Sequence, residues 1–167
     1  MLIRQATHSD VPAILPMVQE ICEMHERRDP ERFRVKADVL EMYAQWLPKR
    51  IEDPRSVLLV AELPGIEGLA GYVVCTIEPE IPIFWVPECA WVHDIFVVPS
   101  ARKHGLAAAL LREVIRRYTA MNIRQVRLHT GTFNQDARAF FQRQGFRTSV
   151  VEMLLTLPDG ANPTTGA

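Results

Sequence analysis

Residues that could carry chemistry gather in one stretch, VHDIFVVPSARKHGLAAALL, at positions 92–111. A strand-like run holding His93 and Asp94 is followed by a basic turn with Gly105, and then by a helical pattern. Free backbone N–H groups at a helix start, together with the positive end of the helix dipole, favour a bound phosphate or pyrophosphate. The stretch therefore indicates an anion-binding turn beside two titratable side chains, although such a turn can also simply start a helix.

Hydrophobic periodicity predicts the elements that position this stretch. Strands are expected at 2–6, 56–62, 68–76, 90–98, 125–130 and 148–157, and helices from position 9 or 10 to about 24, at 38–50, at 105–121 and at 134–145. The polar residues 25–34 are expected to form an exposed connection. Within strand 90–98, a period of two places His93 on the face of Trp91 and Asp94 on the opposite face.

The composition is that of an ordinary globular protein. Hydrophobic residues make up 48% of the 167 residues and charged residues 23%, which suits one domain at 1–157 with a flexible tail at 158–167. The net charge of -1 argues against nucleic acid as a partner. The three cysteines show no metal or disulfide spacing, and no signal or membrane segment is apparent, so we expect a cytoplasmic protein without metal or membrane attachment.

Two motifs stand in the second half of the chain. The first is a strand followed by V-x-P and by Q/R-x-x-G-x-G/A at the start of a helix, where Val97, Pro99, Arg102, Gly105 and Ala107 fill the motif positions. The second is a helix capped by asparagine and ended by a Gly-Phe pair, in NQDARAFFQRQGF at 134–146. Both motifs resemble those of the GNAT superfamily of N-acetyltransferases, and the resemblance covers about residues 91–157.

The resemblance implies an α/β fold of the α+β kind. Its mixed, mostly antiparallel sheet would have about six to seven strands and about four flanking helices, and would splay open at the cofactor site. It also implies acetyl-coenzyme A (acetyl-CoA) as cofactor and the Val97 N–H as the donor to the reacting carbonyl oxygen. The residues implied to contact the cofactor are Phe96, Val97, Val98, Arg102, Lys103, His104, Gly105, Leu106, Ala107, Asn134 and Phe141.

Acetyl transfer needs a neutral amine, and because an alkylammonium has a pKa of roughly 10.4 a base must remove a proton. His93 is the first candidate, since an unperturbed histidine, with a pKa of about 6.5, is mostly neutral at pH 7. The position resembles a strand histidine of arylalkylamine N-acetyltransferases and holds glutamate in diamine acetyltransferases. A histidine hydrogen-bonded for structural reasons is the alternative. Asp94 is the second catalytic candidate, or else a structural hydrogen-bond acceptor.

Phe141 departs from the family pattern, because many relatives have a tyrosine there that protonates the leaving thiolate. A phenyl ring cannot donate a proton, although a thiol pKa near 8.5 makes the thiolate a fair leaving group. Transfer by direct attack of the amine is therefore the favoured function. A coenzyme A-binding sensor without turnover is the alternative.

The acceptor is expected to be a primary amine of a small molecule, with protein N-termini or lysines as the alternative. The segment EPEIPIFWVPE at 78–88 is too apolar for an ordinary loop and too rich in proline for a regular strand, so it could line a pocket. Candidate acceptor contacts are Phe84, Trp85, Glu88, Trp91 and His129. Since relatives often pair, a homodimer is a candidate assembly.

Overall fold

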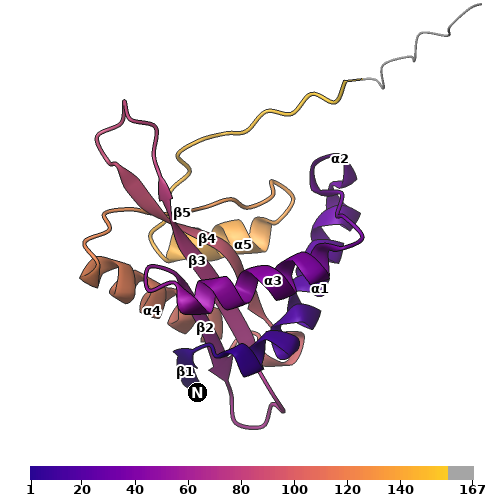
Figure 1. Ribbon diagram of the computed structural model, residues 1–167. Helices are drawn as coiled ribbons and strands as arrows, with labels where there is room; N and C mark the ends of the chain where they lie inside the picture. Colours follow the sequence, from indigo (N-terminus) through magenta and orange to yellow (C-terminus); the bar gives the residue numbers. More distant parts are fainter. Residues whose placement is uncertain (158–167) are drawn as a thin grey trace, which may run out of the picture.

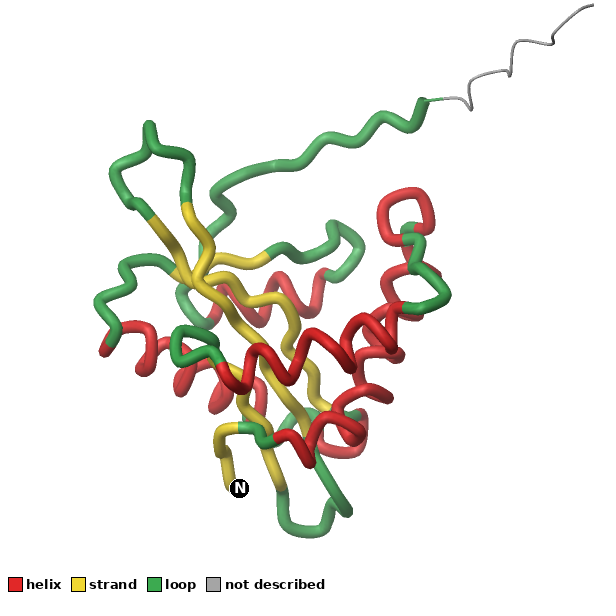
Figure 2. Tube along the Cα trace, in the orientation of Figure 1, coloured by secondary structure: helices red, strands yellow, loops and turns green. Residues whose placement is uncertain are grey.

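A five-stranded sheet with helices on both faces forms the body of the protein (Figures 1 and 2). The computed structural model describes residues 1–157. The strands, in the spatial order of their numbers, are β1 (Leu2–Gln5), β2 (Val57–Glu62), β3 (Gly71–Pro79), β4 (Glu88–Val97) and β5 (Val126–Leu128). The helices are α1 (Val11–Arg28), α2 (Pro30–Phe33), α3 (Val39–Glu52), α4 (Leu106–Ala120) and α5 (Gln135–Arg143), with 3-10 turns at His8–Asp10 and Pro99–Ala101.

The core lies on both faces of this sheet because alternate residues of each strand point in opposite directions. Leu59 and Val73 pack with Leu110 of α4 on one face. Leu58 and Val74 pack on the other face with the helices α1 and α3. The central strand β2 is buried on both faces, which explains its continuous apolar run VLLVA.

The sheet is open between β4 and β5. Successive strands pair antiparallel from β1 to β4, whereas β4 and β5 are parallel and pair only from Ala90 with Val126 to Val92 with Leu128. Strand β4 continues to Val97, so within residues 1–157 its last part has a strand on the β3 side alone. The expected mixed sheet, splayed at this point, is confirmed.

A β-bulge interrupts β4 beside the opening. The register shifts between Val74 and Cys75, which pair with Asp94 and Val92, and His93 between them has no partner on β3. Because the extra residue reverses the alternation, His93 and Asp94 both face α1 and α3. The expectation that they lie on opposite faces was wrong.

The sheet has five strands rather than six or seven, and residues 148–157 do not form the expected strand. These residues lie beside no other strand of the described chain, so no ladder of hydrogen bonds can form on them. The expected flexible tail, 158–167, lies outside the described residues.

Residues 25–34 are largely exposed, as expected, but they are not a simple connection, because they complete α1 and form α2. Pro30 occupies the first position of α2, where its fixed φ suits a helix start. The Asp29 side chain accepts the Arg32 N–H at 3.3 Å and so caps the helix. Among residues 1–157 no helix is both long enough and apolar enough to cross a membrane.

Candidate active site

The turn between β4 and α4 presents a row of free backbone N–H groups. Lys103 and Gly105 have φ angles of 67° and 76°, so the chain passes twice through the left-handed region before α4 begins. The Arg102 N–H is bonded to the Pro99 carbonyl at 3.3 Å. The N–H groups from Lys103 to Ala107 donate to no described residue. With the positive end of the 15-residue helix α4 behind them, they favour an anion.

The Arg102 side chain braces this turn against β4. Its Nε donates to the Val97 carbonyl at 3.1 Å, and its guanidinium carbon lies 5.8 Å from the Phe96 ring centroid. A longer contact of 3.5 Å reaches the Glu20 carboxylate. Arg102 was predicted to contact the cofactor. Its side chain instead holds the turn in place, and its backbone N–H already donates to the Pro99 carbonyl.

The Val97 N–H faces the opening of the sheet. The next residue, Val98, donates its N–H to the Ala70 carbonyl on the β3 side at 3.0 Å. Because N–H groups alternate between the two edges of a strand, the Val97 N–H points away from β3. It lies on the edge that β5 leaves unpaired, where a ligand in the opening could accept its hydrogen bond.

His93 is held in one tautomer by two neighbouring side chains. Its Nε2 lies 2.6 Å from the Thr76 hydroxyl, which donates at 2.5 Å to a carboxylate oxygen of Glu78. Since the hydroxyl has a single hydrogen, it must accept from the ring, so Nε2 carries the proton and Nδ1 is the free basic nitrogen. Trp46 packs edge-on against the ring with centroids 5.2 Å apart. Burial lowers the pKa of His93, while Glu78 opposes this, and the ring is therefore neutral at pH 7.

Asp94 lies next to His93 but bonds to different groups. Its carboxylate accepts from the Tyr72 hydroxyl at 3.2 Å and also from Tyr43. Burial raises the pKa of Asp94, and the two hydroxyl bonds partly offset that rise. Burial, followed by the charge of Asp94, raises the pKa of Tyr43 well above its usual value. These bonds suit a structural acceptor better than a proton-transfer group.

Sequence reasoning did not select two groups of aromatic side chains, one of which reaches His93 through Trp46. His25, Phe33 and Phe133 form one cluster, with centroids 4.9 to 6.1 Å apart. Tyr43 and Trp46 form a second contact at 5.7 Å. The rings come from α1, α2, α3 and the loop before α5. Tyr43 and Trp46 could have been identified from the sequence, because both lie on the apolar side of the predicted helix 38–50. Phe33 could not, because it lies in a stretch that was expected to be exposed.

The predicted acceptor contacts are only partly brought together. Trp91 faces the same side as His93 and packs edge-on against His129, with centroids 4.7 Å apart. Glu88 is paired with Arg55 at 2.6 Å. Five residues separate Glu88 from His93, which is roughly 17 Å along a strand.

Phe84 and Trp85 lie still further away, in the loop that closes the β3–β4 hairpin and projects from the body (Figure 1). They are 54% and 80% exposed, and Trp85 carries the guanidinium of Arg124 over its ring at 4.8 Å. The structure therefore does not place these two rings beside His93.

Two predicted cofactor contacts lie at α5. The Asn134 side chain caps this helix by accepting the Ala137 N–H at 3.1 Å, as expected, and Gly145, with φ of 92°, follows its end. Phe141 is buried and packs against Phe140 and Phe146. Its ring thus has a clear structural role.

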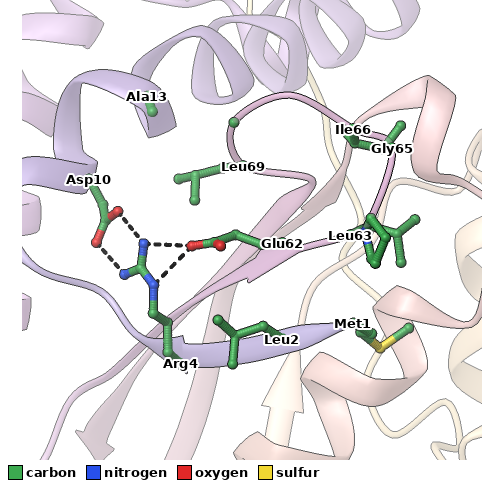
Figure 3. A pocket seen from close by; sticks show the side chains of 12 residues that line it. Met1, Leu2, Arg4, Asp10, Ala13, Glu62, Leu63, Gly65, Ile66 and Leu69 are labelled. Carbon is green, nitrogen blue, oxygen red and sulfur yellow. Dashed lines mark hydrogen bonds and ion pairs between the residues drawn. The ribbon is translucent and has the colours of Figure 1, made fainter.

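A cavity of about 660 Å³ lies at the β1 edge of the sheet, away from β4 and β5. Figure 3 shows that its charged lining residues satisfy one another, since Arg4 binds Asp10 at 2.7 Å and Glu62 at 2.9 Å. Within residues 1–157, no three His, Cys, Asp or Glu side chains are grouped to hold a metal ion.

Together, the splayed sheet, the free N–H row and the bulged strand define a fold in which the sheet opens beside the start of a helix. Comparison with known families agrees: the model of the Acetyltransferase (GNAT) family matches residues 18–146, and the chain belongs to that family. The family resemblance inferred from the sequence is confirmed, and the protein is an acyltransferase of this family.

Known proteins similar to the chain span nearly its whole length. The uncharacterized N-acetyltransferase YhfO of Bacillus subtilis is 29% identical over 161 residues, covering 95% of this chain and 99% of YhfO. A tetramutant of the BH1408 protein from Bacillus halodurans has a TM-score of 0.81 at 21% identity, covering 94% of this chain and all of that one. A predicted acetyltransferase from Clostridium acetobutylicum, solved with acetyl-CoA, has a TM-score of 0.72 at 13% identity, covering 93% of this chain and 95% of that one.

Proposed function

We propose that the protein transfers the acetyl group of acetyl-CoA to a primary amine of a small molecule by direct attack. The observation that carries the proposal is the row of free N–H groups from Lys103 to Ala107, which lies next to the unpaired edge of β4. The same strand presents His93 with a free basic nitrogen. The candidate base, the unpaired strand edge and the anion-binding turn thus follow one another along β4 and the turn after it.

The residues present fit acetyl-CoA. The N–H groups of Lys103, His104, Gly105, Leu106 and Ala107 would hold its diphosphate, and the edge of β4 at Phe96, Val97 and Val98 would hold its pantetheine arm. Asn134 and Phe141 would complete the opposite wall from α5. When bound, acetyl-CoA supplies the activated acyl group.

The side chains of the site account for proton movement. His93 Nδ1 takes a proton from the acceptor ammonium, and the hydrogen-bonded Thr76 and Glu78 keep the ring oriented and stabilise its positive charge. The Val97 N–H donates to the carbonyl oxygen as negative charge develops on it. The amine nitrogen bonds to the carbonyl carbon, loses its second proton to water, and the C–S bond breaks. The released thiolate takes a proton from water, since Phe141 has none to give.

We infer a compact acceptor because Trp46 packs against the His93 ring and Tyr43 bonds to Asp94, so aromatic side chains of α3 stand beside the bulge, and aromatic faces attract ammonium groups. Action in the cytoplasm is part of the proposal and agrees with the three free cysteines.

A panel of small primary amines, incubated with the purified protein and acetyl-CoA, tests the proposal by the rate of thiol release. Amine-dependent release well above the rate of thioester hydrolysis is expected for at least one small amine. Release only with peptides would shift the acceptor class to proteins. The natural phenylalanine at position 141, where many relatives have tyrosine, favours a second candidate function. This is a coenzyme A sensor, which would bind acetyl-CoA without releasing thiol with any amine.

A further inference from the structure

Arg50 on α3 is a partly buried cation whose hydrogen-bonding groups the described chain does not satisfy. Its Nε–H is shielded from solvent, yet it donates to no acceptor among residues 1–157. Its Nη1 lies 3.7 Å from a carboxylate oxygen of Asp53, which is too long for a hydrogen bond. A charged group that is removed from water without hydrogen bonds is costly. The side chain is still 24% exposed, so part of it is open to a ligand.

Asp53 does not neutralise Arg50, because its carboxylate is engaged by other groups. One oxygen accepts the Ser56 hydroxyl at 2.7 Å, and the other accepts the Arg55 N–H at 2.9 Å. The pKa of Asp53 is lowered mainly by these two hydrogen bonds and less by the charge of Arg50. Asp53 thus stabilises the turn after α3 and leaves the guanidinium available.

Arg50 stands beside the candidate base. Its guanidinium carbon lies 5.6 Å from the centroid of the Trp46 ring, which is one helical turn earlier on α3. The His93 ring packs edge-on against the same indole, with centroids 5.2 Å apart. Burial lowers the pKa of His93 most, Glu78 opposes that shift and Arg50 adds to it, so both charges lie near the ring.

The base therefore has one charge of each sign in its surroundings. Glu78 lies 3.8 Å from His93 Nε2 with 46% of its side chain exposed, and Arg50 lies beyond Trp46. An acceptor with an ammonium group at His93 and an anionic group at Arg50 would match both charges. An acceptor with a second ammonium group would bring like charge toward the unpaired guanidinium, which is unfavourable.

We propose that the acceptor is a primary amine that also carries a carboxylate, and that Arg50 binds this carboxylate while the amine lies at His93. The inference rests on the acetyl transfer proposed above and names the class of its acceptor. A guanidinium presents its N–H groups in a fork that matches the two oxygens of a carboxylate, and its single charge matches a single negative charge. Because an indole ring separates the base from the guanidinium, several carbons between amine and carboxylate suit the site better than the single carbon of an α-amino acid.

Three straight-chain amines with the same number of carbons test the proposal: γ-aminobutyrate, butylamine and diaminobutane. Thiol release from acetyl-CoA by the natural protein should give a kcat/KM about tenfold or more higher for γ-aminobutyrate than for butylamine, as expected for a hydrogen bond to a charged group. Diaminobutane should be the poorest of the three.

Arg50→Met removes the charge from this position and should make the values of kcat/KM for γ-aminobutyrate and butylamine similar. Calorimetry with acetyl-CoA shows whether the variant is folded. Lys49→Met is the matched control, because it removes a positive charge from an exposed neighbouring position of α3 and should keep the preference. Equal values for the two amines in the natural protein, or a preference that survives Arg50→Met, would overturn the proposal.

Binding measured without turnover separates this proposal from acetyl transfer itself. Calorimetry of γ-aminobutyrate with protein saturated by coenzyme A should find saturable binding in the natural chain and binding about tenfold or more weaker in Arg50→Met. Such binding without any thiol release would support the carboxylate site and refute the transfer. Thiol release with butylamine, together with no binding of γ-aminobutyrate, would refute the carboxylate site alone.

Discussion

His93 owes its proposed role to the side chains beside it. A neutral imidazole can carry its proton on either nitrogen, and a base must present the bare one to the substrate. Because Thr76 gives its only hydrogen to Glu78, it fixes the proton of His93 on Nε2. The sequence identified His93 through its place in the strand, but it contained no signal for this arrangement, since Thr76 and Glu78 come from the neighbouring strand.

Replacing His93 with alanine should lower kcat by about 10²-fold or more, because a positioned base contributes at least that much. Calorimetry should find the affinity for acetyl-CoA unchanged. In the natural protein, kcat/KM should fall with decreasing pH only below about 6.5, since burial lowers the pKa of His93 from its ordinary value. The control His8→Ala changes an exposed histidine that faces Glu52 and should leave both rate and pH profile unaltered. Wild-type kinetics in His93→Ala would remove His93 from the mechanism.

Thr76 is a positioning residue. Thr76→Val removes its hydroxyl while keeping nearly the same side-chain shape. Losing the acceptor for Nε2–H should reduce kcat by roughly fivefold with a smaller change in KM, as expected for one hydrogen bond worth about 1 kcal/mol. Thr76→Ser keeps the hydroxyl and should restore most of the rate. If the serine variant is as slow as the valine variant, packing rather than the hydrogen bond explains the loss.

At the scale of elements, the irregular parts of the chain build the site. The β-bulge turns His93 and Asp94 to one face, and the left-handed turn at Lys103 and Gly105 leaves the first amides of α4 free. Both depart from ideal strand and helix geometry, as functional sites often do. A prediction from sequence periodicity assumes ideal strands and helices. It therefore located β4 and α4 but assigned Asp94 to the wrong face of the sheet.

Gly105→Ala should weaken the binding of acetyl-CoA. An alanine at φ of 76° costs roughly 1–2 kcal/mol even though its Cβ would meet no atom within 4 Å. Relief of that strain would rotate the amides that follow, so we expect about a tenfold rise in the Kd measured by calorimetry. Gly65→Ala is the matched control, because Gly65 has φ of 84° and the same open space but lies in a remote loop. Equal affinities in the two variants would contradict the assigned role of the turn.

At the scale of the whole molecule, the sequence predicted the central architecture and missed its extremities. Strands β1 to β5 and the helices α1, α3, α4 and α5 lie close to their expected positions because each buries a periodic apolar face. Residues 25–34 are polar, so their helical structure depends on the Asp29 cap and on Pro30 rather than on periodicity. Residues 148–157 have a strand pattern, but a strand needs a neighbour, and no pattern within the segment shows where that neighbour lies.

The ion pairs at the β1 edge should make the free energy of unfolding depend on pH. Arg4 holds the pKa of Asp10 well below its usual range, so the carboxylate stabilises the fold above the unfolded-state pKa of about 3.9. That contribution is lost as pH falls through the lower folded-state pKa. Asp10→Asn should cost about 2 kcal/mol of unfolding free energy at pH 7, measured by urea denaturation, and the deficit should shrink toward pH 2. Glu23→Gln, which changes an exposed carboxylate bonded to Gln19, should cost little at any pH.

The proposed activity depends most on the anion seat formed by the amides from Lys103 to Ala107. Isothermal titration calorimetry of the natural protein with acetyl-CoA tests it without knowledge of the acceptor. We predict saturable binding at one site per chain, with coenzyme A competing for the same site. A folded protein that produces no binding heat with either compound over a range of temperatures would contradict the central claim.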